Sequence, residues 1–536
     1  MIPIVKPVLA RICLGTVLVS GLISTTNAFG QTALSSAQIA DANALYATHC
    51  AACHNGDRLG GMGPALLPES LEKLRGNGIS DVIRDGRAAT QMPAFGETLA
   101  ATEITLLEDW LRQPMDRSPE WGMSEIVQSH DVFIDPAELP DKPKFKSDPL
   151  NLFTIVEAGD HHVTILDGDT FEPLDRFPTR FALHGGAKYS PDGRFVYLAS
   201  RDGWVQMYDL YSLQTVAEIR VGLNTRNVAV SDDGRYVMAG NMLPHNLVLL
   251  DARDLTPIRE FAVIGDDGKS SRVSAVYTAP PRHSFIVALK DLPEVWEISY
   301  ADDPRPVYPG FVHNYEANMV EALDVQNGPF PVRRIHLGDG LDDFFFDQDY
   351  RHLIGAARNG RDGQVINLNV GRKVADIALE GMPHLGSGIT FDYQGHSVLA
   401  TPHLKDSKIS VIDMESWKTI KTIETKGPGF FTRSHDNTPY AWVDVFFGPD
   451  KDVVHIIDKH TLEIVKTLRP DPGKVAAHVE FDRSGQHALL SIWDDDGAII
   501  VYDAQTFEEI KRIPMKKPVG KYNVFNKITY SAGTSH

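Results

Sequence analysis

One unit, repeated along most of this 536-residue chain, limits the folds that the chain can adopt. The unit is an apolar-alternating strand that ends in Asp, a short turn and a second strand, a pattern typical of half-buried antiparallel strands. Six clear copies are residues 163–177, 205–219, 247–261, 409–423, 454–468 and 499–513, and two degenerate copies are residues 295–307 and 365–377.

The spacing of the copies predicts an architecture. The aligned positions 167, 209, 251, 299, 369, 413, 458 and 503 are separated by 42, 42, 48, 70, 44, 45 and 45 residues. Repeats of about 40–50 residues with several strands each are typical of propeller blades. Asp-Gly turns at residues 190–194 and 231–235 recur one strand earlier in the unit. We therefore predict an all-β eight-bladed propeller, with an insertion of about 25 residues inside the longest step.

The charge of the chain excludes one class of partner. A propeller is a scaffold that serves many functions, so the fold alone does not define an activity. The 71 acidic and 52 basic residues give a net charge of −19, and such a surface repels phosphate backbones. We expect no nucleic-acid partner. The three cysteines are too few for a disulfide framework.

Two of these cysteines belong to a heme-attachment motif upstream of the repeats. Cys50, Cys53 and His54 form the C-x-x-C-H signature of c-type heme. Thiols one helical turn apart can each add to a heme vinyl group, and the adjoining histidine can then ligate the iron. A zinc site would need a second pair of ligands, and a redox C-x-x-C would not need the histidine. We predict one covalent heme c.

The flanking sequence predicts a small all-α domain around this heme. Residues 36–48 and 101–111 have the apolar periodicity of helices. Residues 91–95, QMPAF, resemble the Met-Pro-x-Phe loop of class I cytochrome c. That resemblance implies Met92 as the sixth iron ligand, a position in which a thioether raises the heme potential. Met62 is the weaker alternative.

The first 28 residues are predicted to direct export. Lys6 and Arg11 form a basic start, residues 12–23 are apolar, and residues 26–28 supply a small-x-Ala cleavage site. Such a short apolar run does not reach the ~20 residues that a membrane-spanning helix needs. A retained membrane anchor is the alternative. We expect an exported, periplasmic protein without a membrane span.

The order of the domains resembles the cytochrome cd1 nitrite reductase family. The shared segments are residues 119–123 (PEWGM) between the domains and residues 520–526 (GKYNVFN) near the C-terminus. In that family a c-heme domain precedes an eight-bladed propeller that binds non-covalent heme d1. After the predicted signal peptide (1–28), the resemblance implies a cytochrome c domain (29–117) and a heme d1-binding propeller (118–536).

The resemblance also implies which residues surround heme d1. His184 matches the proximal iron ligand, and Arg201 and Arg226 match arginines that hold the acidic substituents of the macrocycle. Guanidinium groups suit this role because they pair with carboxylates in a bidentate manner. His384 matches one of the two distal histidines of nitrite reductase.

The chain departs from nitrite reductase on the distal side. In the segment of the second distal histidine, Pro280 stands at the ligand position and His283 lies three residues away. Ser387 replaces the arginine that follows the retained histidine. Nitrite reduction needs two proton donors above the iron, and this chain keeps one.

The remaining pattern resembles the family members that complete heme d1 biosynthesis, the dihydro-heme d1 dehydrogenases. They oxidise a propionate of the macrocycle to an acrylate, and histidines matching His384 and His478 are implicated in the reaction. The resemblance implies that His384, helped by His478, accepts a proton, and that electrons pass to heme c and then to a periplasmic acceptor. Nitrite reductase or other heme d1 maturation proteins are further expected partners. The alternatives are a nitrite reductase that uses His283 as second donor, and a heme d1 carrier without activity.

Overall fold

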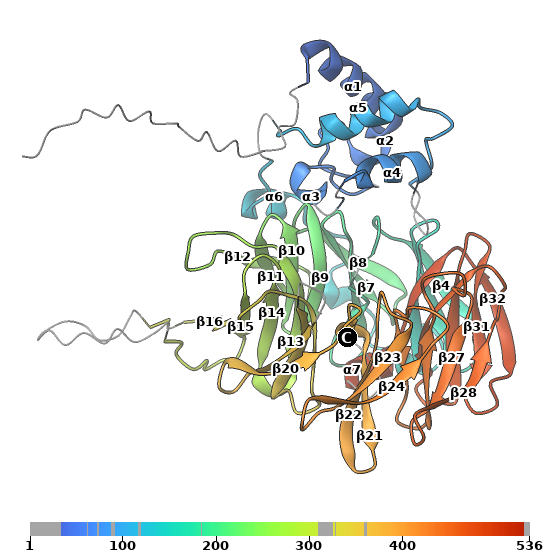
Figure 1. Cartoon of the computed structure of the whole chain (residues 1–536). Coiled ribbons are helices and arrows are strands. Elements are labelled where there is room, and N and C mark those ends of the chain that lie inside the picture. Colours follow the sequence, from blue (N-terminus) through green and yellow to red (C-terminus); the bar gives the residue numbers. More distant parts are fainter. Residues whose placement is uncertain are drawn as a thin grey trace, which may run out of the picture.

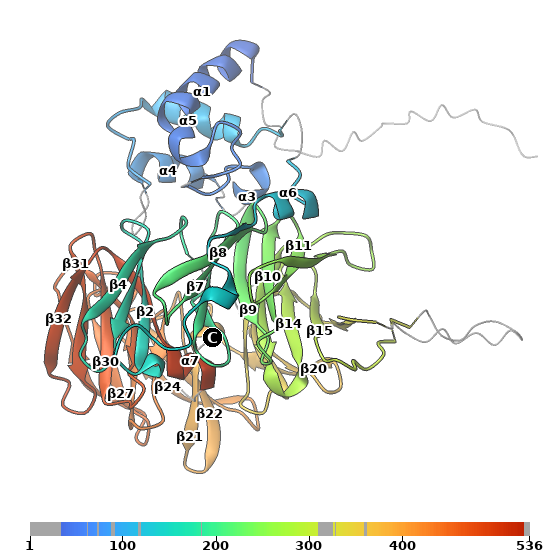
Figure 2. The ribbon, with the colours of Figure 1, turned by 180° about the vertical axis from the view of Figure 1, so that it is seen from behind.

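The computed structural model describes residues 34–61, 63–71, 74, 76–86, 92–115, 119–183, 185–308, 325–326, 328–357 and 362–529. In this part of the chain, a small helical domain lies on one face of a ring of eight sheets (Figures 1 and 2). The predicted export signal, Met62 and His184 lie outside the described residues. The predicted domain boundary falls within residues 116–118, which are also outside them, and stays a prediction.

The helical domain is built around the heme-attachment motif. Its described helices are α1 (Ser36–His49), α2 (Ala51–His54), α3 (Pro68–Leu71), α4 (Gly78–Asp85) and α5 (Ala101–Leu111). α1 begins after Ser35, which exchanges hydrogen bonds with Gln38 in a capping box. Tyr46 of α1 packs in one apolar cluster with Leu107 of α5. The two helices predicted over residues 36–48 and 101–111 are confirmed.

Eight antiparallel sheets form the blades of the propeller. The first four blades are β33 (Pro518–Asn523), β2 (Leu152–Glu157), β3 (His162–Asp167) and β4 (Pro173–Pro178); β5 (Lys188–Tyr189), β6 (Phe195–Ala199), β7 (Trp204–Asp209) and β8 (Gln214–Arg220), with β1 (Asp131–Val132) at the edge; β9 (Asn224–Val230), β10 (Tyr236–Leu243), β11 (Asn246–Asp251) and β12 (Pro257–Ala262); and β13 (Val273–Ala279), β14 (Ser284–Leu289), β15 (Glu294–Ser299) and β16 (Val332–His336). The predicted insertion joins β15 to β16, and most of it lies outside the described residues.

The other four blades repeat this order. They are β17 (Leu341–Phe346), β18 (His352–Ala357), β19 (Asp362–Asn367) and β20 (Arg372–Ala378); β21 (Ile389–Tyr393), β22 (His396–Pro402), β23 (Lys408–Asp413) and β24 (Lys418–Glu424); β25 (Thr432–Arg433), β26 (Tyr440–Asp444), β27 (Val454–Asp458) and β28 (Glu463–Leu468); and β29 (Val475–Phe481), β30 (His487–Trp493), β31 (Gly497–Asp503) and β32 (Glu509–Met515). Short helices α6 (Met123–Gln128), η1 (Pro136–Glu138), η2 (Pro149–Asn151), η3 (Pro280–Arg282), η4 (Leu385–Ser387) and α7 (Val524–Thr529) connect or follow the strands.

The C-terminal strand closes the ring. β33 pairs antiparallel with β2, from Phe153 opposite Asn523 to Glu157 opposite Pro518, so the first and last parts of the propeller share one blade. α7 follows directly and lies at the end of the central axis away from the helical domain (Figure 1). Radial closure removes the open edges that a long stack of sheets would expose. The predicted eight-bladed propeller is confirmed.

The recurrent Asp has a local structural role. Its carboxylate accepts a backbone amide two or three residues further on and so forms the turn into the fourth strand, as at Asp167, Asp209, Asp251, Asp413, Asp458 and Asp503. In the blade of β17–β20 the side chain of Asn367 does the same, accepting the amide of Asn369 at 3.0 Å. The alignment at position 369 was therefore wrong by two residues, because the turn-forming side chain of that blade is Asn367.

The two domains are joined through a buried arginine. Arg220, at the end of β8, donates from Nη2 to the carbonyl of Leu59 at 2.5 Å and from Nε to the carbonyl of Asp202 at 2.9 Å. Its guanidinium lies 4.6 Å from the ring centroid of Trp121. An apolar cluster surrounds this contact: Leu59, Ala65, Leu67, Met115, Trp121, Leu223 and Leu243. The loop after the heme motif is thereby held against the propeller.

Replacing Arg220 with Met should loosen this docking. Met keeps apolar contact with Trp121 but removes charge-assisted hydrogen bonds worth about 1.5–3 kcal/mol each. We expect faster proteolytic cleavage between the domains. The matched control is Arg253→Met, because the Arg253 side chain is 79% exposed and pairs with Asp251 of the same turn. Equal cleavage rates in wild type and Arg220→Met would contradict the assignment.

Candidate functional site

The predicted heme c ligands lie on consecutive turns of α1 and α2. Cys50 caps the C-terminal end of α1, and Cys53 and His54 lie in α2, with both thiols free and half-buried. The Nδ1 atom of His54 lies 2.8 Å from the carbonyl oxygen of Pro64, so Nδ1 carries the hydrogen and donates it. That tautomer leaves the lone pair of Nε2 for a metal.

The surroundings of His54 fit a flat prosthetic group. Burial lowers the pKa of His54, which favours the neutral imidazole that ligates iron. Gly63 lies against the imidazole, since a Cβ atom at Gly63 would be 2.5 Å from the ring. Met92 precedes a loop that is anchored by the amide of Phe95, which donates to the carbonyl of Ile83 at 2.9 Å. The role of Met92 as sixth ligand stays a prediction.

The residues predicted to surround heme d1 gather at one end of the propeller axis. Arg201 follows β6, Arg226 lies in β9, His384 precedes η4, and His478 lies in β29. Asp202, next to Arg201, bonds to Arg220, which contacts the helical domain. This end is therefore the face on which the helical domain docks.

The residues after His184 connect its segment to the same face. Gly185 has a φ of +83°, and a Cβ atom there would lie 2.3 Å from the Cβ of Asn227, the residue after Arg226. A Cβ atom at Gly186 would lie 3.1 Å from the ring of Tyr522. Only glycine allows this backbone conformation and these close approaches. The position of the His184 side chain itself lies outside the described residues.

His384 is oriented as a proton acceptor. Its Nδ1 lies 2.8 Å from the carbonyl oxygen of Phe430, so Nδ1 is protonated and Nε2 keeps its lone pair. The His384 and Phe430 rings are in edge contact at 4.3 Å between centroids. Burial lowers the pKa of His384, which keeps the imidazole neutral at neutral pH.

His478 lies on the other side of an aromatic residue that contacts both histidines. The centroid of the Phe431 ring is 4.7 Å from that of His478 and 6.4 Å from that of His384. His478 is 2% exposed, and its Nδ1 has no hydrogen-bond partner among the described residues. Burial, together with the charge of Lys521, lowers the pKa of His478 well below its ordinary value. The neutral ring is a second candidate base or an orienting group.

A single carboxylate holds both histidine segments. Asp444, at the end of β26, accepts the amides of Phe430 at 2.8 Å, Phe431 at 3.1 Å and His478 at 3.2 Å. Phe430 in turn holds His384 through its carbonyl oxygen. Burial raises the pKa of Asp444 to about 6, against the effect of these three donors. Sequence reasoning missed Asp444, because no local motif marks it.

Replacing Asp444 with Asn should disturb His478. The amide oxygen of Asn can still accept from Phe430 and Phe431, but its NH₂ group cannot accept the His478 amide. A buried donor without a partner costs about 1–3 kcal/mol. We expect that loss of unfolding free energy in denaturant titration, and no change for the control Asp254→Asn, whose amide oxygen can still accept the exposed amide of Thr256. Unchanged stability would exclude this role for Asp444.

Arg226 and Asp343 form an ion pair whose charges act on His384. Arg226 donates from Nε to the carbonyl of Ser274 at 2.6 Å, and its Nη2 lies 3.8 Å from Oδ2 of Asp343. Tyr277 donates to Oδ1 of Asp343 at 3.1 Å. Arg201 contacts the sulfur of Met242 at 3.2 Å. Both arginines are partly buried, a setting in which a carboxylate ligand would be bound with little screening.

Pro280 and His283 are not part of this site, which corrects the predicted alignment. β13 starts near Arg226 and runs away from the docking face, and Pro280 follows its last residue. At about 3.3 Å per residue, Pro280 lies roughly 20 Å from Ser274 along the strand. His283 is exposed and contacts Asp232 at 3.2 Å. A second distal donor at either position would lie at the wrong end of the blade.

A further His-carboxylate group in the described residues is better explained as ion pairs. Asp266, Glu294 and His336 lie within metal-binding range of one another. However, the two ring nitrogens of His336 face different carboxylates, at 3.9 Å from Glu294 and 3.7 Å from Asp266. Arg334 already bonds Asp266 at 2.7 Å. A single ion could use only one of these nitrogens.

Comparison with known proteins gives the family. The cytochrome D1 heme domain family matches residues 147–317 and 309–527, and the family described as cytochrome C oxidase, cbb3-type, subunit III matches residues 37–111. The chain is 55% identical over 508 residues to the dihydro-heme d1 dehydrogenase of Pseudomonas aeruginosa, covering 94% of this chain and 97% of that protein. This chain belongs to the dihydro-heme d1 dehydrogenase family.

Other relatives place this family member among heme d1 proteins. A solved structure described as dihydro-heme d1 dehydrogenase NirN in complex with DHE matches with a TM-score of 0.81 and 55% identity, covering 91% of this chain and all of that one. Nitrite reductase of Stutzerimonas stutzeri is 25% identical, with 97% of this chain and 98% of that protein covered.

None of the helices in the described residues has the length and apolar character that a bilayer crossing requires.

Proposed function

We propose that this protein dehydrogenates a propionate of dihydro-heme d1 to the acrylate of heme d1. The observation that carries the proposal is a pair of neutral histidines on either side of Phe431, the partly buried His384 and the buried His478. They lie on the propeller face against which the heme c motif is docked. Identity of 55% along nearly the whole chain to a protein named for this reaction supports it.

Separate groups of residues accept the protons and bind the substrate in this reaction. Converting CH₂–CH₂ to CH=CH removes two electrons and two protons. Nε2 of His384 takes a proton from a side-chain carbon, and His478 orients the propionate or takes the second proton. Arg201 and Arg226 bind carboxylates of the substrate, and His184 ligates its iron.

Heme c is the electron acceptor in this proposal. Cys50 and Cys53 would hold it covalently, and His54, through Nε2, and Met92 would ligate its iron. When bound, heme c supplies a one-electron acceptor close to the substrate face. The contact of Arg220 with Leu59 keeps this loop of the helical domain against the propeller.

The setting of the protein is part of the proposal. The basic and apolar N-terminal residues support export to the periplasm. There the electrons would pass to a periplasmic acceptor. The product is the cofactor of a nitrite reductase, so nitrite reductase or another heme d1 maturation protein is the proposed recipient.

Anaerobic absorbance spectroscopy tests the proposal against its two alternatives. Purified holoprotein is mixed with dihydro-heme d1 and followed with time. Conversion to heme d1 with reduction of heme c is the expected result. Stable binding without conversion would indicate a carrier. Turnover of nitrite to nitric oxide at a rate comparable to dehydrogenation would indicate a nitrite reductase.

A further inference from the structure

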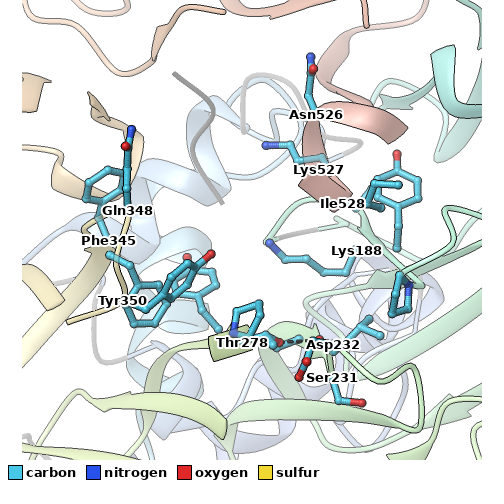
Figure 3. A pocket seen from close by; sticks show the side chains of 18 of the residues that line it. Lys188, Ser231, Asp232, Thr278, Phe345, Gln348, Tyr350, Asn526, Lys527 and Ile528 are labelled. Carbon is cyan, nitrogen blue, oxygen red and sulfur yellow. Dashed lines mark hydrogen bonds between the residues drawn. The ribbon is translucent and has the colours of Figure 1, made fainter. Parts of the chain in front are cut away.

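A cavity opens at the α7 end of the propeller axis, on the face away from the helical domain. Its volume is about 510 Å³. Figure 3 shows Lys188 of β5 and Lys527 of α7 pointing into it from neighbouring elements. Thr278, Gln348 and Tyr350 lie around the same space. The proposed reaction assigns no task to these two lysines.

Lys188 is connected to the substrate face through two side chains. Its Nζ lies 5.2 Å from the centroid of the Tyr277 ring, and Tyr277 itself lines the cavity. The Tyr277 hydroxyl donates to Asp343 at 3.1 Å. The Asp343 carboxylate lies against Gly386, where a Cβ atom would be 2.4 Å from Oδ2, and Gly386 is two residues from His384. Polar groups therefore extend from the cavity to the segment of the first histidine.

Lys527 is connected to the second histidine in a similar way. Its Nζ lies 4.0 Å from Oε2 of Glu480, which is fully buried and two residues from His478. Asn526, beside Lys527, donates to Glu480 at 3.2 Å. Each candidate base is thus two residues from a position that carries or contacts an acidic side chain. Each of these acidic side chains acts on one of the two lysines at the cavity.

The two ammonium groups can exchange protons near neutral pH. Burial lowers the pKa of Lys188 to about 8 and that of Lys527 to about 7. Asp343 opposes the shift of Lys188, and Glu480 opposes that of Lys527. A group with a pKa near the working pH is the most effective carrier of protons.

We propose that this cavity is the proton exit of the dehydrogenation. Protons taken from the substrate at His384 and His478 pass by Asp343 and Tyr277 to Lys188, and by Glu480 to Lys527, and then to water in the cavity. The two electrons leave in the opposite direction, one at a time through heme c to the periplasmic acceptor, so two protons and two one-electron transfers balance each double bond formed. The inference rests on the proposed function.

The test is single-turnover conversion of bound dihydro-heme d1 by the holoprotein with oxidised heme c and an excess of a soluble one-electron oxidant that re-oxidises heme c. Lys188→Ala combined with Lys527→Ala should bind the substrate with an unchanged spectrum but convert it at least about tenfold more slowly. Added methylamine, which can enter the enlarged cavity, should restore the rate. The control is Lys269→Ala, because Lys269 is exposed and pairs with Asp267 in an exposed turn.

Arginine variants separate proton exchange from charge and packing. Lys188→Arg with Lys527→Arg keeps both positive charges, but guanidinium does not release its proton. This variant should bind normally and convert slowly. Conversion at the wild-type rate in the arginine variant, or a slow alanine variant that methylamine does not accelerate, would overturn the proton exit. Failure of the wild type to convert the substrate would instead overturn the proposed function.

Discussion

His384→Ala is expected to bind dihydro-heme d1 and lose most of its dehydrogenation. The imidazole is held by the Phe430 carbonyl, is kept neutral by burial, and presents Nε2 as the acceptor atom. A general base contributes about 10²–10⁴-fold to a rate, and we expect a loss in this range. Single-turnover absorbance measurements under anaerobic conditions give the rate, and the spectrum before conversion reports binding.

The control for this variant is His396→Ala, since His396 is 60% exposed on β22. It should convert the substrate at the wild-type rate. A loss below tenfold in His384→Ala would assign His384 an orienting role and make His478 the base. Loss of substrate binding in His384→Ala would show that His384 binds the substrate and does not act mainly as a proton acceptor.

Replacing both Cys50 and Cys53 with Ala is expected to abolish covalent heme and catalytic turnover together. These are the two thiols described in the structure, and they lie on one helical turn beside His54. After denaturation and extraction, the variant should show no c-type absorption band. Dehydrogenation should then fall below detection, because no one-electron acceptor remains at the docking face.

The single variant Cys50→Ala is the matched control. It keeps one thiol and the iron ligand His54, so a fraction of the protein should still carry covalently bound heme that resists extraction. Full dehydrogenation by the double variant would show that electrons leave by a route other than heme c. Full covalent heme in the double variant would place the attachment elsewhere in the chain.

Local patterns account for what could be predicted of the fold. The Asp-ended unit recurs because each blade needs the same turn between its third and fourth strands, and an Asp carboxylate forms that turn. The prediction was in error where Asn367 replaced Asp, since the amide performs the same task two residues earlier than the aligned position. The predicted number of blades was still correct, because a shift of two residues is small compared with the spacing of about 40–50 residues between repeats.

The candidate site was predicted less completely. His384 and His478 came from resemblance, whereas Asp444, Phe431 and Asp343 had no signal in the sequence. Asp444 bonds residues 13, 14 and 34 positions away, in segments that carry no common motif. A carboxylate that accepts three backbone amides is identical, in a sequence, to a carboxylate at any other strand end.

Sequence patterns were sufficient for the features whose chemistry is contained in neighbouring residues or in a fixed period. These are the C-x-x-C-H motif of residues 50–54, the helices on either side of it, and the eight blades. The three-dimensional structure was needed to show which face carries the site, that Pro280 lies at the far end of its strand, and that Lys188 and Lys527 share a cavity. The physical reason is ring closure: pairing of β33 with β2 brings the inner strands of all blades around one axis. Side chains from blades far apart in the chain then become neighbours, and the spacing of residues along the chain does not predict these contacts.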